Sequence, residues 1–362
     1  MKKRIVIQNI ADIHFGKTGK EKELYESLKK HFIQRCIDTE TDIIFINGDS
    51  YDSRQLINSD ANIYFNKFID DCVSIGAIVV ILNGTESHDR YQINALAYRS
   101  SDRFFIVNTV TELTLCGLKF LLLPEEYVRS QTYYDEYLSK KYDFVQFHGM
   151  FSHIGFGAKG NVENVRHPYV FNWKQFAKNI KYYVVGGHIH THSVYKNIIY
   201  SGSFGRLNFG EEEDKGWVEC VVENNKCFWK FLVNTDAMTF TTILASSLPK
   251  DVDSMMKMLR GYQEYNDFLR IDIDVDDSNI INNIEGFVKN HKNCVIKRGK
   301  KKGIELTEKI SKNLQEKQDK LDTIMKEFKG MDFIQITQKI AKDEYRREFT
   351  REEIYDIINT KV

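Results

Sequence analysis

The sequence predicts an α/β protein whose main domain is a two-layered β-sandwich flanked by helices. Short apolar runs, typical of buried strands, alternate with amphipathic helical stretches over residues 1–234. Several of these runs are followed directly by Asp and His residues. The pattern changes near residue 235, and 362 residues are too many for one ordinary core, so we expect two further parts.

The main domain is predicted at 1–234. Strands at 4–10, 43–47 and 77–82 alternate with helices near 20–38 and 60–75. A polar helix is predicted near 129–140 and a long loop at 152–170. The remaining strands of this domain are predicted at 104–108, 113–116, 118–123, 143–147, 182–186, 193–200, 216–223 and 227–233.

The second part, at 235–300, is predicted to be a small α+β domain. Pro249 opens a helix, the segment 268–275 alternates with period two, and Ser278 caps a second helix. The third part, at 301–362, begins with a helix over 304–328 that carries an apolar stripe, and further helices follow it. Such a tail buries its stripe poorly on itself, so we expect it to dock on a partner.

Composition excludes several classes of protein. Lys+Arg 51 against Asp+Glu 51 gives no net charge, so any contact with nucleic acid must come from local patches. Six cysteines without a C-x-x-C pair indicate buried thiols in a reducing compartment. The first apolar run is broken at Gln8, and no run of about 18 apolar residues follows. We therefore expect a cytoplasmic protein that makes no membrane contact.

Asp and His residues stand at the ends of five predicted strands. They occur in Asp12-Ile13-His14, Gly48-Asp49, the loop from Gly84 to Asp89, His148-Gly149 and Gly187-His188-Ile189-His190. In an open α/β sheet, ligands bind outside the carboxyl ends of the strands, so these residues are expected to converge. One Asp-x-His pair alone is more often a turn with a solvated histidine. Five clusters in this arrangement predict a metal site.

The residue types narrow the choice of metal. Carboxylates mixed with imidazoles suit Mn²⁺, Fe²⁺ or Zn²⁺, whereas an all-oxygen set would suit Mg²⁺ or Ca²⁺. One Asp between two ligand sets can bridge two ions, which lie about 3.5–4 Å apart in such centres. Asp49 follows Gly48, which leaves room for the backbone to approach the ions.

The order of these motifs resembles the calcineurin-like metallophosphoesterase superfamily, whose fold is the predicted two-layered sandwich. Within that superfamily, two segments resemble the SbcD-type nucleases, which work at DNA ends with an SMC-like ABC ATPase. These segments are Tyr200-Ser201-Gly202-Ser203 and the stretch from Asn208 to Gly216.

The resemblance also implies roles for individual residues. His88 matches the catalytic histidine of the family, and Asp89 matches the carboxylate that pairs with it. One ion would be held by Asp12, His14, Asp49 and His190, and a second by Asp49, His148 and His188. The two ions would stabilise charge on the attacking and leaving oxygens of a phosphodiester.

The function implied by the resemblance is that of a Mn²⁺-dependent DNA nuclease subunit in repair or recombination. It would act as a 3′–5′ exonuclease and as a single-strand or hairpin endonuclease, in a homodimer, in a cell or a virus-infected cell. The small domain would cap the site and help select DNA. The C-terminal helices would bind the ATPase partner.

The chain departs from the family pattern at one position. The family has Gly-Asn-His-Asp, whose Asn binds the second metal, but here Ser87 precedes His88, and Thr85 and Glu86 separate it from Gly84. A hydroxyl is a poorer ligand than an amide oxygen. We therefore expect that Ser87 binds weakly, or that Glu86 or a water takes its place.

Several residues remain open between two interpretations. Arg206 and Asn208 are candidate phosphate contacts, with a structural role equally plausible. Lys297 and Arg298 open a basic run that binds DNA backbone or forms a solvated hinge. The histidines and aspartate near the motifs fit supporting or surface positions better than ligand positions; they are Asp52, His153, His167 and His192.

Two rival functions also remain. One is a metallophosphoesterase that acts on a phosphoprotein or a nucleotide. The other is a catalytically weakened scaffold that binds its partner at DNA ends.

Overall fold

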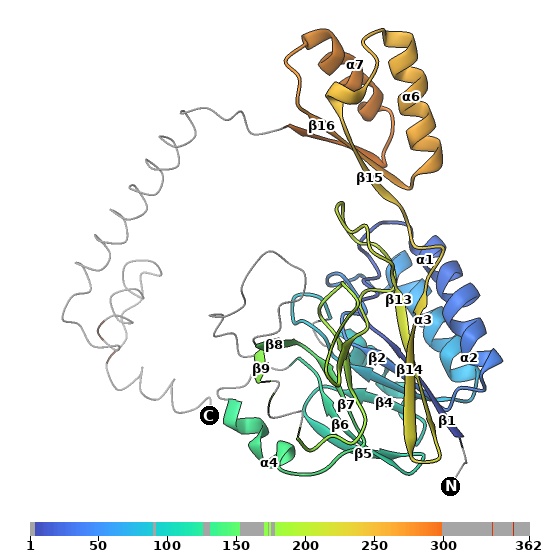
Figure 1. Ribbon diagram of the computed structural model, residues 1–362, viewed down its shortest axis with the longest axis vertical. Coiled ribbons are helices and arrows are strands. Elements are labelled where there is room, and N and C mark those ends of the chain that lie inside the picture. Colours follow the sequence, from blue (N-terminus) through green and yellow to red (C-terminus); the bar gives the residue numbers. More distant parts are fainter. Residues whose placement is uncertain are drawn as a thin grey trace. The chain divides into compact units, whose positions relative to one another are not determined.

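The structure is a computed structural model (Figure 1). It describes residues 4–89, 92–125, 131–152, 170–172 and 178–298, with 174, 335 and 350 as isolated positions. By its internal contacts the chain divides into Met1–Arg298 and Gly299–Val362. Nearly all of the second unit, including the predicted helix over 304–328, lies outside the described residues. The docking role of the tail stays a prediction.

The first sheet of the main domain has six strands in the order β14-β13-β1-β2-β3-β4. The four strands from β1 to β4 are parallel, and β13 runs antiparallel to β1. The strands are β1 (Arg4–Ile10), β2 (Ile43–Asn47), β3 (Ile78–Leu82), β4 (Phe104–Val107), β13 (Gly216–Glu223) and β14 (Lys226–Val233).

The second sheet has six strands in the order β11-β12-β10-β7-β6-β5. Its inner strands β6, β7, β10 and β12 are parallel, and the edge strands β5 and β11 are antiparallel to their neighbours. The strands are β5 (Thr111–Leu115), β6 (Leu118–Leu123), β7 (Phe144–His148), β10 (Val184–Gly187), β11 (Ser193–Tyr195) and β12 (Ile198–Tyr200).

Along a strand of the first sheet, successive side chains pack alternately against the second sheet and against the helices. Phe45 packs between the two sheets with Phe120 and Phe144. Its neighbours Ile44 and Ile46 face the opposite way, against the helices. Because both faces of the sheet are covered, its strands are continuous apolar runs. The predicted two-layered sandwich flanked by helices is confirmed.

Helices cover the outer face of the first sheet (Figure 1). They are α1 (Glu21–Ser27), a π-helical segment η1 (Leu28–Ile33), α2 (Gln34–Asp38) and α3 (Asp60–Ser74). The predicted helix near 20–38 is thus one helical stretch with a π-helical middle. Shorter helical turns elsewhere are η2 (Gln92–Arg99), η3 (Gln131–Tyr134) and α4 (Asp135–Leu138).

The segment predicted as a loop at 152–170 has a strand at each end. β8 (Met150–Ser152) pairs in parallel with β9 (Val170–Asn172). The rest of that loop, with His153 and His167, lies outside the described residues.

The small domain is a three-stranded parallel sheet with two helices. Strands β15 (Phe240–Leu244), β16 (Phe268–Ile273) and β17 (Cys294–Arg298) alternate with α6 (Val252–Tyr265) and α7 (Ser278–Lys289). A short turn η5 (Ala245–Ser247) follows β15. The sequence analysis missed β15, which is short and mostly half-exposed. It also misplaced both helix starts: α6 is capped by Asp251 and does not begin at Pro249, and Asp277, not Ser278, accepts the first free amides of α7.

Two expectations about the chain as a whole can be compared with the structure. Four of the six cysteines, Cys36, Cys72, Cys220 and Cys294, are buried as predicted, whereas Cys227 is half-buried and Cys116 is exposed. In the part of the chain that the structure describes, no helix has both the length and the apolar character needed to cross a bilayer.

Candidate metal centre

The strand ends bring the predicted ligands together. Three groups of potential ligands form, and within each group one ligand atom per residue lies within 4.8 Å of the others. The groups are Asp12, His14 and His190; His14, Asp49 and His88; and Asp49, His148 and His188. Because His14 and Asp49 are each shared, the groups form one strand-end cluster of seven residues.

The backbone at the cluster adopts conformations that L-residues rarely take. Asp12, His14, Asp49 and His188 all have positive φ, between 50° and 92°. Such strain tends to collect at functional sites, where the surrounding contacts hold it in place. Here the loops after β1 and β2 are joined by backbone hydrogen bonds, of 3.0 Å from His14 N to Asp49 O and 3.1 Å from Asp12 N to Gly48 O.

Gly48 is required by this close approach. Its φ is +81°, and a Cβ at this position would lie 2.2 Å from Nδ1 of His148. Any other residue would therefore push the His148 ring away from Asp49.

The histidines are oriented by contacts outside the cluster. Nδ1 of His148 lies 2.7 Å from the carbonyl oxygen of Asn47, so this nitrogen donates and Nε2 faces Asp49 Oδ1 at 3.3 Å. A histidine held in this way presents its other nitrogen to a metal.

The segment from Asn208 to Gly216 supports His190. Glu211 places Oε1 3.6 Å from Nδ1 of His190 and Oε2 2.8 Å from the Lys215 ammonium. Lys215 is itself buried and donates to the carbonyl oxygen of His190 at 3.0 Å. Burial raises the pKa of Glu211, but hydrogen bonds from His190 and Lys215 outweigh it and hold the pKa at about 2.

The buried carboxylates of the cluster have no cationic side chain to balance their charge in the described contacts. Asp12 and Asp49 are buried, and in the described contacts neither pairs with a Lys or an Arg. Burial lowers the pKa of His14 to about 3, so its ring is neutral, and among the described residues neither of its nitrogens has a hydrogen-bond partner. Buried charges and buried donors are normally paired, so a divalent ion fits what these residues lack.

His88 belongs to the cluster, but Asp89 does not pair with it in the described contacts. Nδ1 of His88 contacts the carbonyl oxygen of Asp52, while the Asp89 carboxylate accepts from Tyr51 N at 3.1 Å and Gly84 N at 2.8 Å. Burial, together with the charge of Asp49, raises the pKa of Asp89 to about 7. The prediction that Asp89 pairs with His88 is therefore corrected: Asp89 fixes the loop.

Ser87 is not at the position expected of a metal ligand. Ser87 and the alternative ligand Glu86 are both exposed, and no described hydrogen bond or ion pair joins either of them to the cluster. Thr85 lies there instead: its amide donates to Asp49 Oδ1 at 2.7 Å, and its hydroxyl lies 3.5 Å from Nε2 of His148. The two additional residues of this loop therefore move Ser87 outward.

Glu125 was missed by the sequence analysis. It is buried at the carboxyl end of β6, and its Oε2 lies 3.1 Å from His188 Nδ1 and 3.6 Å from His148 Nε2. The signal was present in the sequence, because a carboxylate stands two residues after the end of the predicted strand 118–123, with Pro124 between them. The strand-end rule that found the other residues applies equally to this one.

Other candidates have structural or peripheral positions. His192 stacks on Phe231 at 4.1 Å between ring centroids. Asp52 borders the cluster: its carboxylate lies 3.0 Å from Lys17 Nζ and 3.7 Å from His14 Nδ1. Asn208 is exposed and donates to Glu211. In β17, Lys297 is exposed and Arg298 pairs with Glu285.

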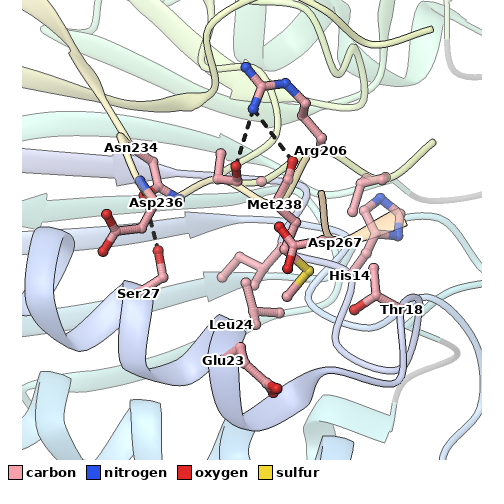
Figure 2. Close-up of a pocket in the computed structure, with 14 residues that line it drawn as sticks. His14, Thr18, Glu23, Leu24, Ser27, Arg206, Asn234, Asp236, Met238 and Asp267 are labelled. Carbon is pink, nitrogen blue, oxygen red and sulfur yellow. Dashed lines mark hydrogen bonds between the residues drawn. The ribbon is translucent and has the colours of Figure 1, made fainter. Parts of the chain in front are cut away.

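Arg206 holds the loop that leads into the small domain. Its guanidinium donates to the carbonyl oxygens of Ala237 at 3.2 Å and Met238 at 3.4 Å (Figure 2), and to that of Glu213 at 3.4 Å. These contacts use the guanidinium within the fold, which favours the structural role of the two interpretations left open for Arg206.

A pocket of about 90 Å³ lies beside His14 (Figure 2). Its charged lining includes the carboxylates of Glu23, Asp236 and Asp267. Lys30 pairs with Asp236 at 2.6 Å and Lys20 with Asp267 at 2.7 Å. Since the Arg206 guanidinium already binds carbonyls, this pocket offers little to attract a phosphate.

Comparison with known proteins adds limited information. No protein-family model and no curated protein sequence matches the chain. Among solved structures, a dimetal phosphatase from Danio rerio is similar, with 9% identity and a TM-score of 0.41, covering 64% of this chain and 96% of that one. A predicted phosphoesterase from Streptococcus pneumoniae has 12% identity and a TM-score of 0.29, covering 64% and 90%. These values are too low to assign a function, so the residues of the site must do so.

Proposed function

We propose that this chain is a metallophosphoesterase that uses two divalent cations, most favourably Mn²⁺, to hydrolyse phosphodiesters in DNA. The observation that carries the proposal is the strand-end cluster, in which Asp49 is grouped with His148 and His188 on one side and with His14, a member of the group of Asp12 and His190, on the other. A carboxylate placed between two ligand sets is the arrangement that bridges a pair of ions. The mixture of carboxylates and imidazoles favours Mn²⁺, Fe²⁺ or Zn²⁺ over Mg²⁺.

The residues divide between two ion positions. The first ion would be held by Asp12, His14, Asp49 and His190, and the second by Asp49, His148 and His188. Such a pair of ions supplies a clamp on the attacking and leaving oxygens of the phosphodiester. The protein contributes rigid placement, because β1 and β2 of the first sheet and β7 and β10 of the second carry these side chains at or just after their carboxyl ends, where the side chains come together.

His88 is proposed as the catalytic histidine. Its Nδ1 contacts the carbonyl oxygen of Asp52, so Nδ1 carries the proton and Nε2 remains for the substrate. His88 lies beside His14, with 4.8 Å between the ring centroids. When both ring nitrogens carry a proton, Nδ1–H stays on the Asp52 carbonyl and Nε2–H can donate to the scissile phosphate or pass its proton to the leaving oxygen.

The choice of DNA within this class is supported by the resemblance of residues 200–216 to SbcD-type nucleases and by the additional small domain. The contacts of Lys215 and Glu211 with His190 give that segment a role in the site. The proposal includes 3′–5′ exonuclease and single-strand or hairpin endonuclease activity, a homodimer, and an SMC-like ATPase bound through the C-terminal helices.

One assay tests the proposal. Purified chain is incubated with end-labelled linear DNA and Mn²⁺, with and without the candidate ATPase, beside an Asp49→Ala control and an EDTA control. The proposal expects shortening of the DNA that both controls abolish. Hydrolysis of a small chromogenic phosphate ester without DNA cleavage would instead indicate a phosphatase or nucleotide hydrolase. Absence of any hydrolysis across a Mn²⁺ titration would indicate a scaffold.

A further inference from the structure

The second ion position needs a ligand beyond the three residues proposed for it. Asp49, His148 and His188 supply one carboxylate and two imidazoles. The residue expected to complete the set, Ser87, is exposed and makes no described contact with the cluster. The search for a replacement therefore starts from the side chains that surround these three residues.

Glu125 is the carboxylate that meets both histidines of this set. Its Oε2 lies 3.1 Å from Nδ1 of His188 and 3.6 Å from Nε2 of His148. The Nε2 atom of His148 is the one that faces the metal position, because Nδ1 is bound to Asn47. The Oε2 atom therefore lies on the same side of the His148 ring as Asp49.

The short contact between Glu125 and His188 is not a normal hydrogen bond. Although Oε2 and Nδ1 are 3.1 Å apart, the Nδ1 atom of His188 is buried and has no aligned hydrogen-bond partner among the described residues. A carboxylate oxygen and an imidazole nitrogen at this distance can also serve as two ligands of one ion, so the spacing of the whole set is compared with that of a coordination shell.

The spacing agrees with a coordination shell. Ligands bound at about 2.1 Å are separated by about 3.0 Å in an octahedral site and about 3.4 Å in a tetrahedral one. The observed separations are 3.1 Å for Glu125 to His188, 3.3 Å for Asp49 to His148 and 3.6 Å for Glu125 to His148.

Thr85 holds this carboxylate in place. Its hydroxyl lies 3.1 Å from Glu125 Oε2 and 3.3 Å from Asp49 Oδ2, between the two acidic side chains. A single hydroxyl proton placed there reduces the repulsion between them and fixes their orientation.

We propose that Glu125 is a direct ligand of the second divalent cation, and that it replaces the neutral amide ligand of related phosphoesterases with a carboxylate. This inference rests on the proposed two-metal function. It gives the second ion two negatively charged ligands, Asp49 and Glu125, which favours a hard cation such as Mn²⁺.

The test measures metal binding, using Mn²⁺ and Co²⁺ alone as probes. Stoichiometry and affinity are measured by titration calorimetry for the full chain, Glu125→Ala, Glu125→Gln and the control Glu86→Ala, which changes an exposed glutamate of the Gly84–Asp89 loop. We expect two ions in the wild type and in Glu86→Ala. In Glu125→Ala the second ion should bind more than about 100-fold more weakly. Glu125→Gln, which keeps an amide oxygen, should lose less affinity for the second ion.

The visible spectrum of the Co²⁺-loaded protein separates a ligand from a residue that only orients His188. Loss of a carboxylate ligand shifts the Co²⁺ bands of Glu125→Gln, whereas loss of an orienting contact leaves the ligand set and the bands unchanged. The proposal is overturned by unshifted bands, by unchanged affinity in Glu125→Ala, or by a wild-type chain that binds only one ion. Glu125→Gln preserves the shape of the side chain, so the test does not depend on whether Glu125→Ala folds.

Failure of the proposed function looks different. A wild-type chain that binds two ions but cleaves neither DNA nor a small phosphodiester would refute the function. The Glu125 results would keep their meaning in that case.

Discussion

Two regions that adjoin strand β1 bury charged groups in opposite ways. In the first, which we call the Glu219 network, the buried carboxylate of Glu219 accepts from Arg35 at 2.7 and 2.9 Å and from Gln8 at 2.8 Å, and pairs with Lys230 at 3.1 Å. In the second, the strand-end cluster, Asp12 and Asp49 are equally buried and have no Lys or Arg partner in the described contacts.

The difference shows how buried polar groups should be interpreted. In the Glu219 network the partners are complete, and even the amide oxygen of Gln8 accepts from Trp217 Nε1 at 2.9 Å. In the cluster, neither nitrogen of His14 has a hydrogen-bond partner among the described residues, and the nearest printed carboxylate oxygens, of Asp49 and Asp52, are each 3.7 Å away. Buried polar groups are normally satisfied, so a missing partner indicates a ligand, whereas burial alone does not. The following predictions test this contrast.

The largest expected effect comes from Asp49→Asn. It should reduce Mn²⁺-dependent phosphodiester hydrolysis by at least about 10³-fold, because the shared ligand loses its charge. Without metal, the free energy of unfolding should change by less than about 1 kcal/mol, since Asn can still accept from Thr85 N. Initial rates and denaturation in EDTA measure the two quantities. Activity within tenfold of the wild type would contradict the shared-ligand role.

His88→Ala should separate catalysis from metal binding within the cluster. The rate of hydrolysis should fall by about 10²–10⁴-fold, the usual loss for a general acid or a phosphate-orienting histidine. Calorimetry should still find both Mn²⁺ ions, because the ring is held by Asp52 and is not among the proposed ligands. Loss of one ion would make His88 a ligand instead.

Metal should stabilise the protein through the cluster alone. At 100 times the dissociation constant, each bound ion adds about 2.7 kcal/mol to the free energy of unfolding. This increment should be present in the wild type and in Glu219→Gln, and should be largely lost in Asp49→Asn. Denaturant titrations with Mn²⁺ and with EDTA measure it. An equal increment in all three proteins would mean that Mn²⁺ binds elsewhere.

The contrast between the regions also separates what the sequence can predict from what it cannot. The cluster was predictable because the carboxyl ends of parallel strands meet at one edge, whatever the details of their packing. Asp12, Asp49, His148 and His188 needed only the positions of their strands. Glu125 obeys the same rule, and was overlooked because no histidine accompanies it.

Positions set by tertiary contacts were not predictable. Thr85 rather than Ser87 faces the cluster because the buried Asp89 carboxylate fixes the loop at Gly84 and Tyr51. Arg206 was a fair candidate for phosphate binding from its sequence neighbours. Its partners, the carbonyls near Ala237, lie about thirty residues away and become visible only when the chain has folded.

Glu219→Gln should affect stability and leave activity unchanged. The free energy of unfolding should fall by about 1–3 kcal/mol, because Arg35 loses its charged partner while part of its side chain can still be hydrated. Hydrolysis rates with saturating Mn²⁺ should stay within about twofold of the wild type. A loss of activity comparable to that of Asp49→Asn would show that the two regions are coupled and would remove the basis of the comparison.

The smallest expected effect is the change with pH in the free energy of unfolding that separates the wild type from Glu219→Gln. Burial raises the pKa of Glu219, but hydrogen bonds from Arg35 and Gln8 outweigh it and hold the pKa at about 2, against about 4.3 for an unfolded glutamate. Between these values the unfolded chain binds more protons, so this contribution to stability is complete above about pH 4.3 and is lost as the pH falls towards 2.

The free-energy difference between wild type and Glu219→Gln should therefore be largest at pH 5 and above and should shrink at pH 3. Denaturant midpoints of both proteins across this range measure it, and subtracting one protein from the other cancels the carboxylates they share. Glu223→Gln, in the same strand, is the matched control and should show a smaller change across this range. A difference that stays constant from pH 6 to pH 3 would mean that the charge of Glu219 contributes nothing, and that the Glu219 network is held by packing and neutral hydrogen bonds.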